Sequence, residues 1–216
     1  VNTRNFAGNS NMELEAFVIW NSNPDPTQDL TLKDLSAHGL RFNFPNDTWS
    51  GHLSYRQFGD AYRPALGFVT RNDFRRVEPR IGWSPRPNID WLRTVRFSAQ
   101  FRHQKGVSTD ITDERKWEFG LLGLDLESGD GFDINATRKF EYLDRAFFVS
   151  EGVKVMPGEY TTLGYRLSVR TTGRRPVSVY GNASLGDFWN GERLNFGGRV
   201  TFRPNPGVSI STNIQH

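Results

Sequence analysis

Apolar and polar residues alternate one by one along most of the chain. In 193–203, Leu194, Phe196, Val200 and Phe202 fall on one side, and arginine, asparagine and threonine fall on the other. Successive side chains of a β-strand point to opposite faces, so this period predicts strands with one apolar and one polar face. About eleven segments show it, near 12–20, 35–44, 49–58, 76–83, 95–102, 116–126, 132–142, 163–170, 177–188, 193–203 and 208–214; only 116–126 is apolar on both sides for part of its length.

Turn signals separate these segments and set their order. Short, Gly-, Pro- or Asn-containing connections occur at 44–47, 128–131, 172–176, 189–192 and 204–207, and longer ones near 21–33, 59–74, 104–114 and 143–158. Segments joined by short turns must be antiparallel neighbours. The predicted fold is therefore an all-β, antiparallel up-and-down meander of about eleven strands in one domain, 1–216, with no helix required.

The amino-acid composition excludes several kinds of protein and of functional site. The 216 residues include 21 Gly and 17 Phe but no Cys, which excludes disulfides, thiolate zinc sites and cysteine nucleophiles. The longest purely apolar stretch, 16–20, is far shorter than the roughly 20 residues of a membrane helix. Residues 1–5 carry no apolar signal-peptide core, so the chain is mature, cytosolic or cut from something longer.

Two settings suit such a meander: a soluble sandwich or lipocalin-like barrel, and a transmembrane barrel whose apolar face meets lipid. Segments of about 9–13 residues favour the second, because globular strands average about 5–6. Aromatic residues at or near segment ends also favour it, since they are placed as an interfacial girdle would be. The candidates are Trp49, Trp83, Trp117, Tyr160 and Trp189.

Five phrases, in order, resemble a known family: 64–76, 82–87, 156–160, 185–191 and 202–206. Together they are similar to the C-terminal β-barrel domain of unknown function in bacterial outer-membrane proteins that carry an N-terminal family-9-like carbohydrate-binding domain. The resemblance covers the chain from about Asn5 onward. It implies a Gram-negative outer-membrane location, outer-membrane lipid as partner, and glycan contact through a missing N-terminal domain.

The resemblance also implies that this chain is a fragment of a larger barrel, and an odd strand count agrees with that. It supplies no catalytic residue. The predicted function is an outer-membrane barrel acting as anchor or conduit, linked to glycan binding or handling. The alternatives are a soluble antiparallel β-domain that binds anionic glycans and a barrel-embedded glycan hydrolase.

Charge is dominated by arginine: only five of the 27 basic residues are lysines, and the net charge is +3. Basic residues are dispersed, so nucleic acid is not an expected partner. The polar sides of the segments carry lumen-facing candidates: Arg80, Arg96, Arg102, Arg166, Arg170, Arg199, Glu78, Glu118 and Glu141. Interleaved signs favour a cross-strand ladder of opposite charges over an anion-attracting lumen, which remains the alternative.

Catalytic and metal-binding patterns are weak. His38 and His52 fall on polar sides of paired segments but lack a third ligand for zinc, and Asp125, Glu127, Asp130 and Asp133 surround a turn without a recognised calcium spacing. Carboxylates for glycoside hydrolysis could come from Glu78, Glu118, Glu141 and Glu192. No catalytic residue, metal or cofactor is expected.

Overall fold

The computed structural model describes residues 2–6, 10–21, 30–63, 71–205 and 207–216. Nearly all of this is β-structure, and one four-residue helix lies within it. The elements are β1 (Asn2–Phe6), β2 (Ser10–Trp20), α1 (Leu32–Leu35), β3 (Ser36–Pro45), β4 (Trp49–Phe58), β5 (Phe74–Trp83), β6 (Leu92–Lys105), β7 (Thr112–Leu126), β8 (Gly131–Leu143), β9 (Phe147–Ser150), β10 (Val153–Val155), β11 (Gly158–Arg170), β12 (Val177–Phe188), β13 (Gly191–Asn205) and β14 (Val208–Gln215).

Twelve of the described strands form one antiparallel sheet in the order β1 to β8, then β11 to β14. The predicted meander is confirmed, because each strand pairs with its sequence neighbour and β8 pairs directly with β11. The eleven expected segments correspond to β2–β8 and β11–β14. The expected count was about eleven, and β1 brings the described sheet to twelve; the sequence pattern did not indicate α1 or the separate β9–β10 hairpin.

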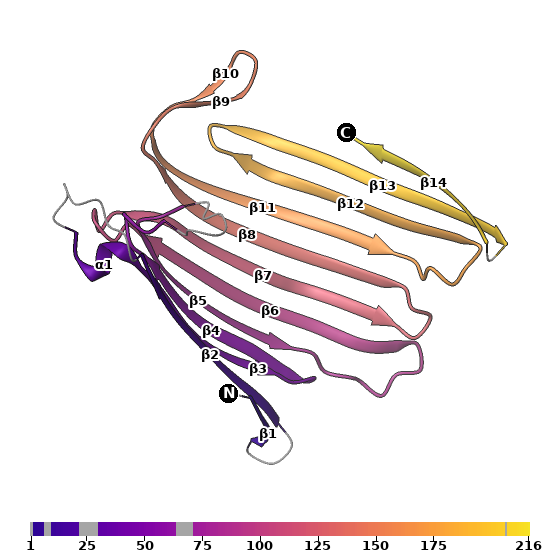
Figure 1. Ribbon diagram of the computed structural model, residues 1–216. Coiled ribbons are helices and arrows are strands. Elements are labelled where there is room, and N and C mark those ends of the chain that lie inside the picture. Colours follow the sequence, from indigo (N-terminus) through magenta and orange to yellow (C-terminus); the bar gives the residue numbers. More distant parts are fainter. Residues whose placement is uncertain (1, 7–9, 22–29, 64–70, 206) are drawn as a thin grey trace.

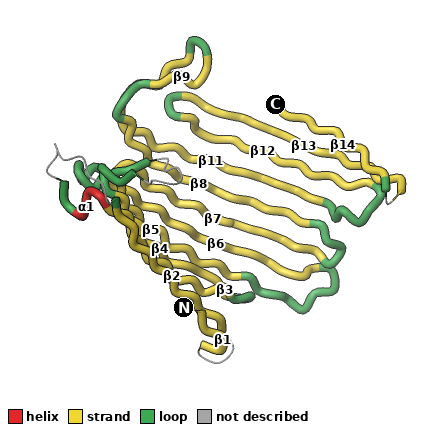
Figure 2. Tube along the Cα trace, in the orientation of Figure 1, coloured by secondary structure: helices red, strands yellow, loops and turns green. Residues whose placement is uncertain are grey.

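The sheet is curved but open. Figure 1 shows it bending from β1 at one edge to β14 at the other, with the β9–β10 hairpin projecting beyond it. No ladder joins β14 to β1 among the described strands. The short connections β3–β4, β7–β8, β11–β12 and β13–β14 lie at the end of the strands opposite α1 and β9–β10, whereas the short β12–β13 turn lies at the same end as α1 and β9–β10 (Figure 2). Of the phrases that carry the family resemblance, residues 64–70 of 64–76 and residue 206 of 202–206 lie outside the described residues.

The register sorts side chains into two faces. The apolar face carries large hydrophobic residues on every strand from β2 to β14, and many of them are exposed: Leu194 is 64% exposed and Ile210 is 58% exposed. The polar face carries charged and amide side chains. Along β7 the apolar-face residues 115, 117, 119 and 121 are exposed, whereas 114, 116, 118 and 120 on the polar face are half-buried. The polar face is therefore the concave, more enclosed side.

A β-bulge explains why 116–126 looks apolar on both sides. Gly120 pairs with Ser98 and Gly123 pairs with Arg96, so three residues of β7 span two of β6. The extra residue reverses the alternation at Leu121–Leu122. Leu122 therefore lies opposite Ile134 on the apolar face. The bulge residue Leu121, next to it, is exposed on that face, so two adjacent leucines lie on the same side of the sheet.

A small core covers the polar face where the long connections end. The rings of Phe58 and Phe74 stack at 4.9 Å between centroids, and Tyr62 meets Phe58 edge-on. Leu35 of α1 is buried at the same end. The loops approach so closely that a Cβ on Gly59 would lie 2.2 Å from the Asp34 carbonyl oxygen, which requires glycine there.

Candidate functional site

All nine predicted lumen candidates lie on the polar face. Their register partners on neighbouring strands are other polar-face residues: Arg80 pairs with His52 and Gln100, and Arg166 pairs with Asn135 and Ser184. They are Arg80, Arg96, Arg102, Arg166, Arg170, Arg199, Glu78, Glu118 and Glu141. The structure thus brings them together on one surface.

An ion-pair ladder crosses β5 to β8. We define it by Glu78, Arg102, Glu114, Lys139 and Glu141. Arg102 donates to Glu78, and its Nη1 lies 3.6 Å from Glu114 Oε1. Lys139 Nζ lies 3.9 Å from Glu114 Oε2 and 2.9 Å from Glu141 Oε1. Alternating signs therefore connect four adjacent strands, as the ladder interpretation predicted.

A second cluster, the Arg–Asp quartet, consists of Arg96, Asp125, Asp133 and Arg170. Each arginine contacts both aspartates, and Arg170 Nη1 lies 3.0 Å from Asp133 Oδ2. Two cations and two anions make the quartet neutral and join β6, β7, β8 and β11. Such a network is more stabilising than isolated exposed pairs.

Glycines make room for the quartet. A Cβ on Gly123 would lie 3.0 Å from the Arg96 guanidinium, and one on Gly131 would lie 2.5 Å from Arg170 Cζ. Both guanidinium groups therefore lie against bare backbone on adjacent strands. The alternation pattern did not reveal that these two glycines make room for guanidinium groups. The signal was nevertheless present, because glycine occupies polar-face positions in strands whose apolar and polar residues alternate.

Two further candidates on the polar face, Arg166 and Arg199, have neutral partners. Arg166 Nε donates to Ser184 Oγ at 3.1 Å, and Arg199 Nε donates to Asn213 Oδ1 at 2.7 Å. The Arg80 side chain is exposed and makes no hydrogen bond or ion pair with the rest of the described chain. Arg166 and Arg199 therefore contact no carboxylate within the described ranges, whereas Arg170 contacts two.

The five aromatic candidates divide between the faces. Trp49 and Trp83 stack on the apolar face at 5.8 Å between centroids, and Trp117 lies there at 4.3 Å from Phe101. Tyr160 pairs with Glu141 on the polar face, and Trp189 donates its Nε1–H to Glu141. The structure therefore leaves three of the five where a lipid-interface girdle would lie.

The polar face encloses an open hollow of about 680 Å³. Its lining includes Arg80, Gln100, Glu118, Arg166 and Arg193. Trp189 also lines the hollow. Its backbone is left-handed, with φ of 49°, a conformation that a bulky residue rarely adopts. Charged and amide groups share this lining with aromatic side chains such as Phe188 and Trp189, so the hollow offers both polar and apolar contacts.

The paired-histidine hypothesis is wrong. His38 pairs with Gln57 and Val18, in phase with Leu40 and Phe42 on the apolar face, whereas His52 pairs with Asn43 and Arg80 on the polar face. The two imidazoles therefore lie on opposite sides of the sheet. The phase of Leu40 and Phe42 in the sequence already contained this signal.

The acidic residues that were considered as calcium ligands form ion pairs with arginines. Asp125 and Asp133 belong to the quartet, Arg175 lies 2.8 Å from Asp130, and Arg93 lies 3.5 Å from Glu127. Arg175, the Thr172 amide and the Ser128 hydroxyl hold the pKa of Asp130 down at about 2. Among the described residues no cluster of three or more histidine or acidic side chains could hold a metal ion.

The carboxylates considered for glycoside hydrolysis also have structural partners. Glu78 is bound by Arg102, Glu118 lies 2.9 Å from Lys116 Nζ, and Glu141 is held by Lys139 and Trp189. Glu192 pairs with Asp187 in the register. These contacts give three of the four a role in joining or bracing strands.

Comparison with known proteins adds no family: the chain matches no protein-family model, no curated protein and no solved structure. Within the described ranges, no helix has the length and apolarity needed to cross a bilayer.

Proposed function

We propose that this chain forms the wall of a bacterial outer-membrane β-barrel that acts as an anchor or conduit and is linked to glycan handling. The observation that carries the proposal is the exposed apolar face of a single-layered sheet. Folded domains in water bury such a face against a second layer. Here large side chains such as Phe196 and Phe202 remain 46% and 45% exposed.

The dimensions of the sheet support a lipid environment for that face. Strands β2–β8 and β11–β13 are 10 to 15 residues long. A tilted strand crosses a bilayer in about 9–11 residues. The four long connections all lie at one end and most of the short ones lie at the other, which is also typical of outer-membrane barrels.

The polar face supports a water-facing interior. Its ion pairs and hydrogen bonds satisfy most of its charges, and the hollow beside them is open to solvent. An open twelve-stranded sheet would close with β1 against β14 or with further strands, since free edges are costly in lipid. The larger-barrel and glycan aspects of the proposal depend on the family resemblance.

Two adjacent residues of β13 provide a direct test, because the chain has no cysteine of its own. Phe196 lies on the apolar face and Asn195 on the polar face, and both are exposed. In the protein reconstituted into phospholipid vesicles, Asn195→Cys should react with a membrane-impermeant maleimide and Phe196→Cys should be protected. Both should react in urea. Equal labelling in vesicles would favour the soluble β-domain.

Measurements of ion conductance distinguish a barrel that acts as a conduit from one that acts only as an anchor. Ion currents across planar bilayers containing the protein would support the conduit, and their absence would leave the anchor. Cleavage of an oligosaccharide that is lost with Glu118→Gln would instead overturn both in favour of the hydrolase.

A further inference from the structure

Two arginines lie on the apolar face, unlike the charged residues of the ladder and quartet. In the register, Arg115 of β7 pairs with Phe140 of β8, and Arg138 of β8 lies between Trp117 and Leu163. Both arginines are exposed. They are therefore diagonal neighbours on adjacent strands, in a surrounding of aromatic and aliphatic side chains.

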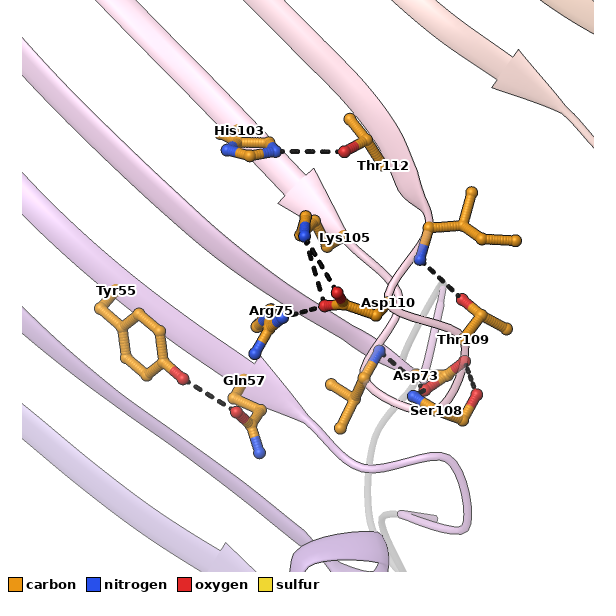
Figure 3. Close-up of polar contacts among 12 residues, drawn as sticks. Tyr55, Gln57, Asp73, Arg75, His103, Lys105, Ser108, Thr109, Asp110 and Thr112 are labelled. Atoms are coloured by element: carbon orange, nitrogen blue, oxygen red, sulfur yellow. Dashed lines mark hydrogen bonds and ion pairs between the residues drawn. The ribbon is translucent and has the colours of Figure 1, made fainter.

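Neither arginine has an anionic partner within the described part of the chain. The Arg115 guanidinium carbon lies 4.6 Å from the centroid of the Phe140 ring, which is a cation–π contact. The Arg138 side chain makes no hydrogen bond or ion pair with the described residues. The neighbouring acids are occupied: Asp110 contacts Arg75 and Lys105 (Figure 3), and Asp113 Oδ2 lies 2.9 Å from Arg71 Nη2.

The pair lies at a boundary on the apolar face. Toward the long connections, the face becomes polar at His103, Arg75 and Lys105, which Figure 3 shows among hydrogen bonds and ion pairs. Toward the short connections, it continues as Phe119 and Leu121, which are exposed. Arg115 and Arg138 thus occupy the level at which an apolar band gives way to a polar rim.

An unpaired guanidinium beside hydrocarbon is costly, and long basic side chains reduce that cost by reaching the polar layer of the membrane. The anion available in that layer is phosphate. A guanidinium binds phosphate through two parallel N–H donors, and it is less strongly hydrated than an ammonium group. Trp117, adjacent to Arg138 in the register, is also a residue type that favours this depth.

We propose that Arg115 and Arg138 together bind the phosphate of an anionic lipid headgroup at the membrane surface nearest the long connections. This rests on the proposed function, because it requires the apolar face to be in lipid. Charge complementarity and continuity with the apolar band both select a membrane lipid as the occupant.

The test uses phosphatidic acid added to the protein in detergent micelles, with lipid-bound protein quantified by native mass spectrometry. Each cation near a charged lipid surface contributes about fivefold in affinity, so Arg115→Gln with Arg138→Gln should weaken binding about 25-fold. Arg166→Gln with Arg199→Gln removes the same charge from the polar face and should change binding by less than about twofold. Arg115→Lys with Arg138→Lys keeps the charge but loses the paired N–H donors of each guanidinium, so binding should fall by less than in the glutamine variant.

Three results would overturn the proposal: unchanged binding in the 115/138 glutamine variant, an equal loss in the 166/199 variant, or displacement of the lipid by an equal concentration of inorganic phosphate. The cysteine labelling separates this failure from that of the proposed function. Protection of Phe196→Cys combined with unchanged lipid binding rejects only the phosphate site. Labelling of Phe196→Cys equal to that of Asn195→Cys rejects the outer-membrane wall itself.

Discussion

Arg96 and Arg102 of β6 lie on the same face of the sheet as Arg166 of β11 and Arg199 of β13, but the two pairs bind different kinds of partner. Arg102 and Arg96 each contact two carboxylates, on strands to one or both sides. Arg166 and Arg199 instead donate to the neutral oxygens of Ser184 and Asn213. The same residue type on the same face is therefore neutralised in one region and left with its full charge in the other.

This difference separates two roles that the sequence alone could not assign. Opposite charges in contact hold neighbouring strands together and cancel their field at a distance. An arginine bonded to a hydroxyl or amide keeps its positive potential toward the concave side. The ladder interpretation therefore applies to β5–β8 and the quartet, while an anion-attracting surface remains a prediction for the region of Arg166 and Arg199.

The largest expected effect comes from breaking the ladder at Arg102. Glu78 is only 7% exposed, so Arg102→Met removes the arginine that is hydrogen-bonded to a buried carboxylate and leaves it the imidazole of His52 at 3.8 Å and the more distant charges of Arg76 and Arg56. We expect the free energy of unfolding to fall by about 3 kcal/mol. Urea unfolding of vesicle-reconstituted protein, followed by tryptophan fluorescence, measures it. Arg199→Met is the matched control and should cost about 1 kcal/mol or less; equal losses would remove the distinction between the regions.

A smaller effect is expected in the quartet. A double-mutant cycle of Arg170→Ala with Asp133→Ala should give a coupling of about 1–2 kcal/mol in the free energy of unfolding, because the two groups share a network. The cycle of Arg166→Ala with Ser184→Ala should give about 0.5 kcal/mol or less, since a single exposed hydrogen bond joins them. A larger coupling in the second cycle would contradict the comparison.

Two glycine-to-alanine substitutions test the same comparison through steric contacts. Gly131→Ala places a Cβ 2.5 Å from Arg170 Cζ, so the guanidinium must move from Asp133. The expected loss of stability is about 1 kcal/mol. In Gly181→Ala the nearest atom, of Val169, is 3.4 Å away, and stability should stay the same or rise. The Gly131→Ala loss should shrink when Arg170 is already alanine; an undiminished loss would point to another cause.

The smallest effect concerns Asp130, in the turn beside the quartet. Its folded pKa of about 2 lies below the usual 3.8 because Arg175, Thr172 and Ser128 favour the ionised form. The turn is therefore stabilised above about pH 3.8, and this contribution is lost as the pH falls through about 2. A carboxyl NMR titration should show a midpoint near 2, and Arg175→Gln should raise it. A midpoint that Arg175→Gln leaves unchanged would show that the ion pair is not formed.

Much of the charged face was predictable because its residues obey a strict two-residue period. All nine candidates share a face for that reason, and the phase of Leu163 and Val169 could also have assigned Tyr160 to the polar face. Which side chain each arginine would contact was not predictable. Whether Arg166 meets a carboxylate or Ser184 depends on which residues of β8 and β12 lie opposite it, and the alternation does not specify that register.

The sequence by itself determined the strands, their antiparallel order and the residues on each face, because alternation and tight turns are local properties of the chain. Only the tertiary structure decided the bulge in β7, the loop core around Phe58, and the pairing of Arg96 and Arg170 with the same two aspartates. Each of these depends on which atoms approach across strands, up to 45 positions apart for Arg170 and Asp125. The same long-range geometry left Arg115 and Arg138 without an anion, because the nearby acids pair with Arg75, Lys105 and Arg71.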